Sequence, residues 1–173
     1  MIPGDRATVL PTDGARPTVV PTASATPVPN VTPSESASPT PVTPEGVTDC
    51  GGAPVTLGGA DLDIVLTGDC PSVTINGTDL DIDTEGATVG SLQLGGDRNE
   101  LDAADISSLT LGGQENDVEA VAIQTLTLNG DRNEIDVQGP IGAVTVSGND
   151  NVVTAGQPGA VTDNGQRNRI AAS

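Results

Sequence analysis

Hydrophobic and polar residues alternate along residues 55–170 in seven copies of one short pattern. Each copy is centred on a glycine, with one hydrophobic residue four positions before it and another five positions after it. Within a copy the alternation has the period of two that is typical of β-strands and not of helices. Successive glycines are 18, 19, 17, 17, 18 and 17 residues apart: Gly59, Gly77, Gly96, Gly113, Gly130, Gly148 and Gly165. Such regular self-similarity at a short period indicates a solenoid.

The length of a copy defines the kind of solenoid. A copy of 17–18 residues holds two or three short strands with corners between them, so each strand can pair only with its equivalents in neighbouring copies. The sequence therefore predicts an all-β fold, a single-stack parallel β-helix of about seven coils. A right-handed coil is favoured, because the hydrophobic positions do not recur every six residues as in left-handed hexapeptide solenoids. The absence of Phe, Tyr and Trp agrees with a narrow core of Val, Leu and Ile.

Residues 1–48 have a different composition, rich in Pro, Thr and Ser, and contain ten of the chain's 14 prolines. Such a segment buries too little apolar surface to fold, so we expect a disordered linker or stalk over 1–48 and the β-helix domain over 49–173. Thr and Ser beside Pro are typical of glycosylated stalks on secreted proteins. The residues after Met1 show no basic stretch and no apolar core, so no signal peptide or membrane-inserting segment is expected in this chain.

Cys50 and Cys70 are the only cysteines, and they lie about one coil apart near the first coil. This separation favours a disulfide that joins the lead-in segment to the first complete coil, with two buried thiols as the alternative. A disulfide is typical of exported proteins, so a secreted or cell-surface location is expected. A metal site built on two cysteines is disfavoured, because the chain contains no histidine.

The formal net charge is −18, and most of it falls on the repeat region, where Arg98, Arg132, Arg167 and Arg169 are the only basic residues. This charge opposes binding to nucleic acids and to anionic membranes, so neither is expected as a partner. Mutual repulsion between copies of the chain favours a monomer.

Carboxylates recur four and six positions after the glycines, so stacked coils would place like charges in two neighbouring columns. The favoured interpretation is a solvated acidic face. The alternative is a set of Ca²⁺ sites, since hard cations prefer carboxylate oxygens, although the calcium-binding nonapeptide and the EF-hand loop are both absent. The candidate ligands are Asp63, Asp81, Asp83, Glu100, Asp102, Asp117, Glu119, Glu134 and Asp136.

Two further columns are predicted to be structural. Two positions after the glycine the charges alternate in sign, which predicts a continuous ladder of ion pairs along Asp79, Arg98, Glu115, Arg132, Asp150 and Arg167. Three positions after the glycine the inward side chain is an amide in five copies, which predicts a buried asparagine ladder. Its members are Asn99, Asn116, Asn133, Asn151 and Asn168. Asp163, in an otherwise apolar column, indicates a polar C-terminal cap.

The motif G-[DN]-x-N-x-[IVL] recurs at residues 96–101, 130–135 and 148–153. It resembles the actinobacterial secreted and lipoprotein family known as domain of unknown function 3060, over about residues 50–170. The resemblance implies a location in the cell envelope or outside the cell. It implies no catalytic residue and no cofactor.

Three classes of function follow from these observations. The favoured one is a non-enzymatic secreted or cell-surface module, structural or binding, displayed on the Pro/Thr-rich stalk. Without His, Lys or Tyr, only carboxylates could act as general acids or bases, so no catalytic residue and no cofactor other than Ca²⁺ is expected. The alternatives are a β-helix protein that acts on or binds polysaccharide, with a cell-envelope or polysaccharide partner, and a phage virion or tail-fibre solenoid. Ice binding by outward threonines is disfavoured, because Gln93, Ala143 and Ala160 interrupt their columns.

Overall fold

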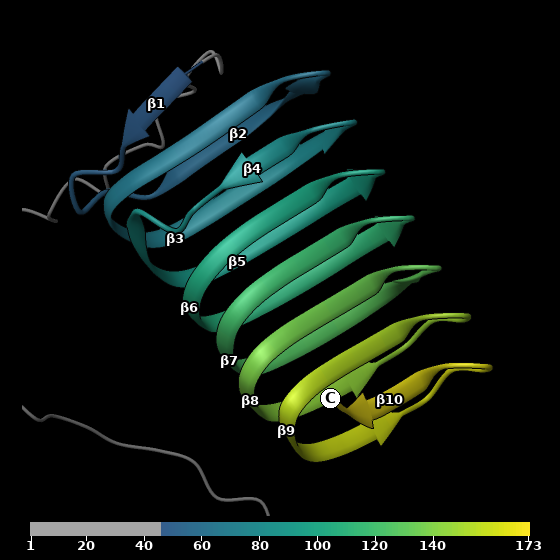
Figure 1. Ribbon diagram of the computed structural model, residues 1–173. Coiled ribbons are helices and arrows are strands. Elements are labelled where there is room, and N and C mark those ends of the chain that lie inside the picture. Colours follow the sequence, from purple (N-terminus) through teal and green to yellow (C-terminus); the bar gives the residue numbers. More distant parts are fainter. Residues whose placement is uncertain (1–45) are drawn as a thin grey trace, which may run out of the picture. The chain divides into compact units, whose positions relative to one another are not determined.

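The computed structural model describes residues 46–173, in which ten strands form one parallel sheet wound into stacked coils (Figure 1). The predicted all-β parallel solenoid of about seven coils is confirmed. The expected stalk over 1–48 lies almost wholly outside the described residues. The strands are β1 (Gly46–Asp49), β2 (Val55–Ala60), β3 (Asp63–Thr78), β4 (Asp81–Asp83), β5 (Ala87–Asp97), β6 (Glu100–Gln114), β7 (Asp117–Asp131), β8 (Glu134–Val146), β9 (Val152–Asp163) and β10 (Arg169–Ala172).

The strands are longer than the sequence pattern predicts. β3 has 16 residues and β6 and β7 have 15 each, because parallel pairing between equivalent residues continues around one corner of each coil. Each long strand therefore bends and contributes to two flat faces of the solenoid (Figure 1). β1 begins at Gly46 and already pairs with β3, so the stack starts before position 49. Among the residues that the structure describes, no helix could span a membrane.

The interior consists of columns in which one aliphatic side chain per coil lies on the next. The column four positions before the glycine runs in register from Val55 to Val161, and Leu109 and Leu126 in its middle are fully buried. Burial of one such side chain contributes roughly 1.5–3 kcal/mol. The last coil has no further coil stacked on it, so Val161 is 46% exposed, whereas Val144 in the preceding coil is 1% exposed.

The repeating glycine is required by close approach between coils. A Cβ atom at Gly113 would collide with the carbonyl oxygen of Gly96, and Gly113 has a φ of +105°, which favours glycine. A Cβ at Gly130, Gly148 or Gly165 would likewise meet the carbonyl oxygen of the equivalent glycine in the preceding coil. The corner therefore admits no side chain at this position.

The residue two positions after each glycine has a left-handed backbone in all seven coils, although none of the seven is glycine or asparagine. A non-glycine residue in this conformation costs about 1 kcal/mol, so the surrounding stack must enforce it. The conformation turns the chain at the corner and directs the next side chain inward, an asparagine in five coils and a leucine in the first two. The seven residues, with φ of 55–59°, are Asp61, Asp79, Arg98, Glu115, Arg132, Asp150 and Arg167.

Candidate functional site

The five predicted ladder asparagines stack at one corner and bind one another across coils. Asn116 shows the pattern: its backbone N–H and its Nδ2 both donate to Oδ1 of Asn133, each at 3.0 Å. Nδ2 of Asn116 also donates to the carbonyl oxygen of Gly96 in the preceding coil, at 3.0 Å. Asn99, Asn133 and Asn151 repeat this pattern, so each of these four amides links three successive coils. Asn99, Asn116, Asn133 and Asn151 are at most 1% exposed.

Both ends of the asparagine ladder have specific partners. At the first end the backbone N–H of Leu80 donates to Oδ1 of Asn99 at 3.1 Å. At the last end Oδ1 of Asp163 accepts from Nδ2 of Asn168 and from the backbone N–H of Gly165, both at 2.8 Å. Asp163 therefore provides Nδ2 of Asn168 with the acceptor that the amide of a further coil would otherwise supply. No buried side-chain nitrogen or oxygen within residues 46–173 lacks a partner, so the ladder amides are fully used in holding the corner.

The charged column beside the ladder forms separate ion pairs, so the prediction of one continuous ladder is wrong. Nε and Nη2 of Arg98 donate to the two carboxylate oxygens of Asp79, both at 2.8 Å. Arg132 pairs with Glu115 at 3.0 Å, and Arg167 pairs with Asp150 at 2.5 Å. Each arginine thus reaches back to the preceding coil only.

The fork shape of the guanidinium explains why the column forms separate pairs and not a continuous ladder. Bidentate pairing uses the Nε and Nη2 edge of Arg98 on a single carboxylate, and Arg132 directs its Nη2 to the side-chain oxygen of Gln114, at 2.6 Å. Although the pairs are exposed, they change the pKa values of the paired carboxylates. Hydrogen bonds from Arg98 lower the pKa of Asp79, and those from Arg167 lower the pKa of Asp150.

The nine candidate calcium ligands lie in two adjoining columns on one outward face, which we call the acidic face. Asp81, Glu100, Asp117 and Glu134 are in direct register, as are Asp83, Asp102, Glu119 and Asp136. Adjacent coils are about 4.8 Å apart, so like charges repel along each column. Within the described part of the chain, no three acidic side chains converge to hold a metal ion. Seven of the nine are exposed, and Asp83 and Asp102 are half-buried.

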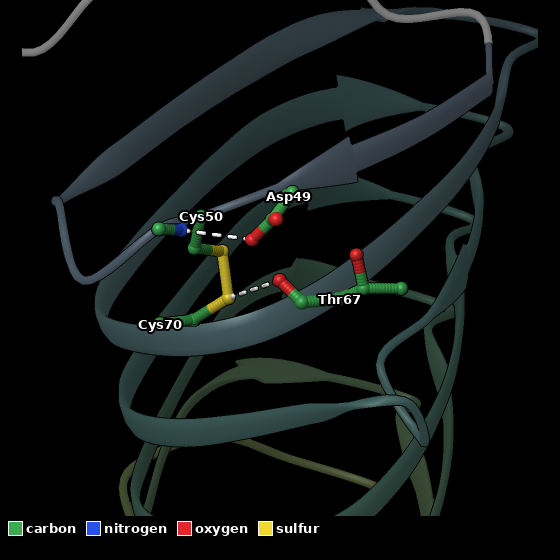
Figure 2. Close-up of a disulfide and its surroundings, with 5 residues drawn as sticks. Asp49, Cys50, Thr67 and Cys70 are labelled. Atoms are coloured by element: carbon green, nitrogen blue, oxygen red, sulfur yellow. Dashed lines mark hydrogen bonds between the residues drawn. A yellow bond between two sulfur atoms is a disulfide. The ribbon is translucent and has the colours of Figure 1, made fainter.

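The predicted disulfide between Cys50 and Cys70 is confirmed (Figure 2). It joins the turn after β1 to the bend of β3, with the two Cα atoms 5.1 Å apart, and both residues are buried. The turn is also held by the backbone N–H of Cys50, which donates to the Thr67 carbonyl at 3.0 Å, and by Oδ1 of Asp49, which accepts from Gly51 at 3.0 Å. The disulfide therefore fixes the first coil to the second.

One comparison with known proteins gives a match. Residues 128–173 match the model of a family described as protein of unknown function, DUF3060. This segment contains β8, β9 and β10 with the last three asparagines of the ladder, Asn133, Asn151 and Asn168. No curated protein and no solved structure matches the chain. The match supports the resemblance of the repeat motif to this family over the C-terminal coils.

Proposed function

We propose that the chain is a non-enzymatic β-solenoid module, secreted or displayed at the cell surface, with a structural or binding role. The observation that carries the proposal is the regular use of its polar groups. The asparagine amides bind one another and backbone carbonyls, and the arginines in register with carboxylates are paired with them. The remaining carboxylates stand in periodic columns, in which no single pair is set apart for acid–base chemistry.

Three observations support export. The Cys50–Cys70 disulfide is of the kind that persists in oxidising compartments. The match to DUF3060 agrees with the resemblance to a family of actinobacterial secreted proteins and lipoproteins. The Pro/Thr/Ser-rich composition of residues 1–48 fits a stalk that holds the solenoid away from a surface.

Export is tested on cells that express the protein from its own gene. Intact cells are treated with a membrane-impermeant biotin hydrazide and a water-soluble carbodiimide, which together label carboxyl groups, because the chain has no lysine. We expect the protein to be labelled on intact cells or to be recovered from the medium, with Cys50 and Cys70 linked in non-reducing peptide maps. Recovery from the cytosol with two thiols that react with iodoacetamide would contradict the proposal.

A further inference from the structure

A groove of about 420 Å³ opens on the outside of the bend shared by β5, β6, β7 and β8. Asp105, Ser107, Ala122 and Gln124 line its centre, and Thr88 and Pro140 lie at its two ends. Val89, Ile106 and Ile123 form its floor, and these three residues are buried. The groove lies apart from the acidic face and from the corner that holds the asparagine ladder.

The groove results from unequal coil lengths. Ten positions separate Ile82 from Leu92, and nine separate Ile135 from Val144. Only eight separate the equivalent residues of the two coils between them, which are Leu101 and Leu109, and Val118 and Leu126. The pairing of β7 with β8 accordingly shifts register between Ala120 and Ile123. Two short bends are thus recessed between two longer ones, which form the rims of the groove.

The chemistry of the lining selects among ligands. Thr88 and Ser107 offer hydroxyls, Gln124 an amide and Asp105 a carboxylate, while Ala122 and Pro140 offer apolar surface. The carboxylate and the net charge of −18 oppose anionic ligands. The strands that form the groove pair with neighbours on both sides, with a gap at the register shift between Ala120 and Ile123, so they present no continuous backbone edge to an extended peptide.

We propose that this groove binds a neutral saccharide. Sugar hydroxyls would hydrogen-bond to Asp105, Ser107 and Gln124, and the apolar face of a pyranose ring would pack on Ala122 and Pro140. About three coil spacings, roughly 14 Å, separate the two rims, which is room for a short stretch of a glycan chain. The inference deepens the proposed function by naming a class of partner.

The test is an NMR titration of the full chain, labelled with ¹⁵N and ¹³C, with maltohexaose, cellohexaose or chitohexaose to about 10 mM. We expect at least one of the three to shift signals of Thr88, Ala122, Gln124 and Gly142. Ala122→Leu fills the groove and should weaken binding at least tenfold, and Asp105→Asn should weaken it several-fold. Ala160→Leu, an equal addition on the last coil, should leave it unchanged.

Three results would overturn the inference: no shift with any of the three hexasaccharides, equal shifts in Ala122→Leu, or shifts confined to residues outside the groove. A ¹⁵N spectrum of each variant shows that it is folded. The inference can fail while the proposed function stands, because export and the disulfide are measured independently of saccharide binding.

Discussion

The asparagine ladder and the acidic face are built by the same operation, with opposite energetic results. Asn116 and Asp117 are neighbours in sequence, and each stacks on like residues in the coils on either side. An amide carries donors and an acceptor, so a column of amides satisfies itself. An ionised carboxylate carries acceptors only, so a column of carboxylates repels itself and depends on water and counterions.

This comparison indicates how a solenoid distributes its polar residues. The column that can satisfy itself lies inside, where an unpaired group would cost about 1–3 kcal/mol, and the column that cannot lies in solvent. We therefore expect stability to depend on the corner that contains the glycines and asparagines. Charge on the outward faces should instead govern solubility and the choice of partners.

The largest loss of stability is expected when a side chain is introduced at a glycine whose backbone lies against the preceding coil, beside the asparagine ladder. Gly113→Ala would place a methyl group against the carbonyl of Gly96 at a φ of +105°. We expect a loss of about 4 kcal/mol in the free energy of unfolding, measured in urea. Gly112→Ala is the matched control: the nearest atom to its Cβ would be the Asn129 carbonyl oxygen at 4.0 Å, so a change within about 1 kcal/mol is expected. Similar losses in both variants would contradict the prediction.

Breaking the ladder itself should cost slightly less. Asn133→Ala removes the acceptor of two buried donors, the backbone N–H and Nδ2 of Asn116, and should lower the free energy of unfolding by about 3 kcal/mol. Asn168→Ala acts on the half-buried end of the ladder, where water can replace the amide, and should cost about 1 kcal/mol. Equal costs at the two positions would show that the ladder is no stronger inside than at its end.

Removing the disulfide should have an effect confined to one end. The Cys50→Ala, Cys70→Ala double variant releases a crosslink between residues 20 positions apart, with an expected loss of about 2 kcal/mol. Hydrogen exchange should rise in β1 and β2 and stay unchanged in β7, because β1 and β2 pair only with β3. Faster exchange throughout the solenoid would instead mean that the first coil controls global unfolding.

The sequence predicts the fold well because its repeat reports contacts between coils directly. The spacing of Gly96, Gly113 and Gly130 predicts which residues stack, and the asparagine column and the Cys50–Cys70 pair follow from the same register. The left-handed corner residues were missed, because Arg98 and Glu115 belong to types that seldom adopt that conformation. Only their position before an inward asparagine could have signalled it.

The ion pairs and the groove depend on details that a repeat average hides. Alternating signs predict neighbours, but the geometry of the Arg98 fork decides that one carboxylate is bound and the next is not. The groove arises from differences of one or two residues in corner length. These differences can be read from the sequence, but the recess they produce is evident only from the three-dimensional arrangement of the bends.

A smaller effect is expected on the acidic face. Asp117→Asn removes a charge from a column of like charges and should raise Tm by about 1 °C, whereas Glu115→Gln breaks the pair with Arg132 and should lower Tm. CaCl₂ and NaCl at matched ionic strength should shift Tm of the unmodified chain equally, because screening relieves the repulsion. Saturable Ca²⁺ binding in calorimetry would contradict this prediction and support the alternative that the nine carboxylates are metal ligands.

The smallest effect concerns the pH dependence of one exposed pair. Arg98 lowers the pKa of Asp79, so the folded state holds this carboxylate ionised more readily than the unfolded chain does. The resulting stabilisation is complete above the pKa of an unfolded Asp, about 3.9, and is lost as the pH falls through the lower folded value. The unmodified chain should therefore exceed Arg98→Met in stability at neutral pH, and the difference should vanish in acid. In carboxyl ¹³C titrations the pKa of Asp79 should rise in Arg98→Met and stay unchanged in Glu115→Gln, because Arg98 binds only the preceding coil. A rise in the second variant would mean that charge is coupled along the whole column, as the alternating signs first predict.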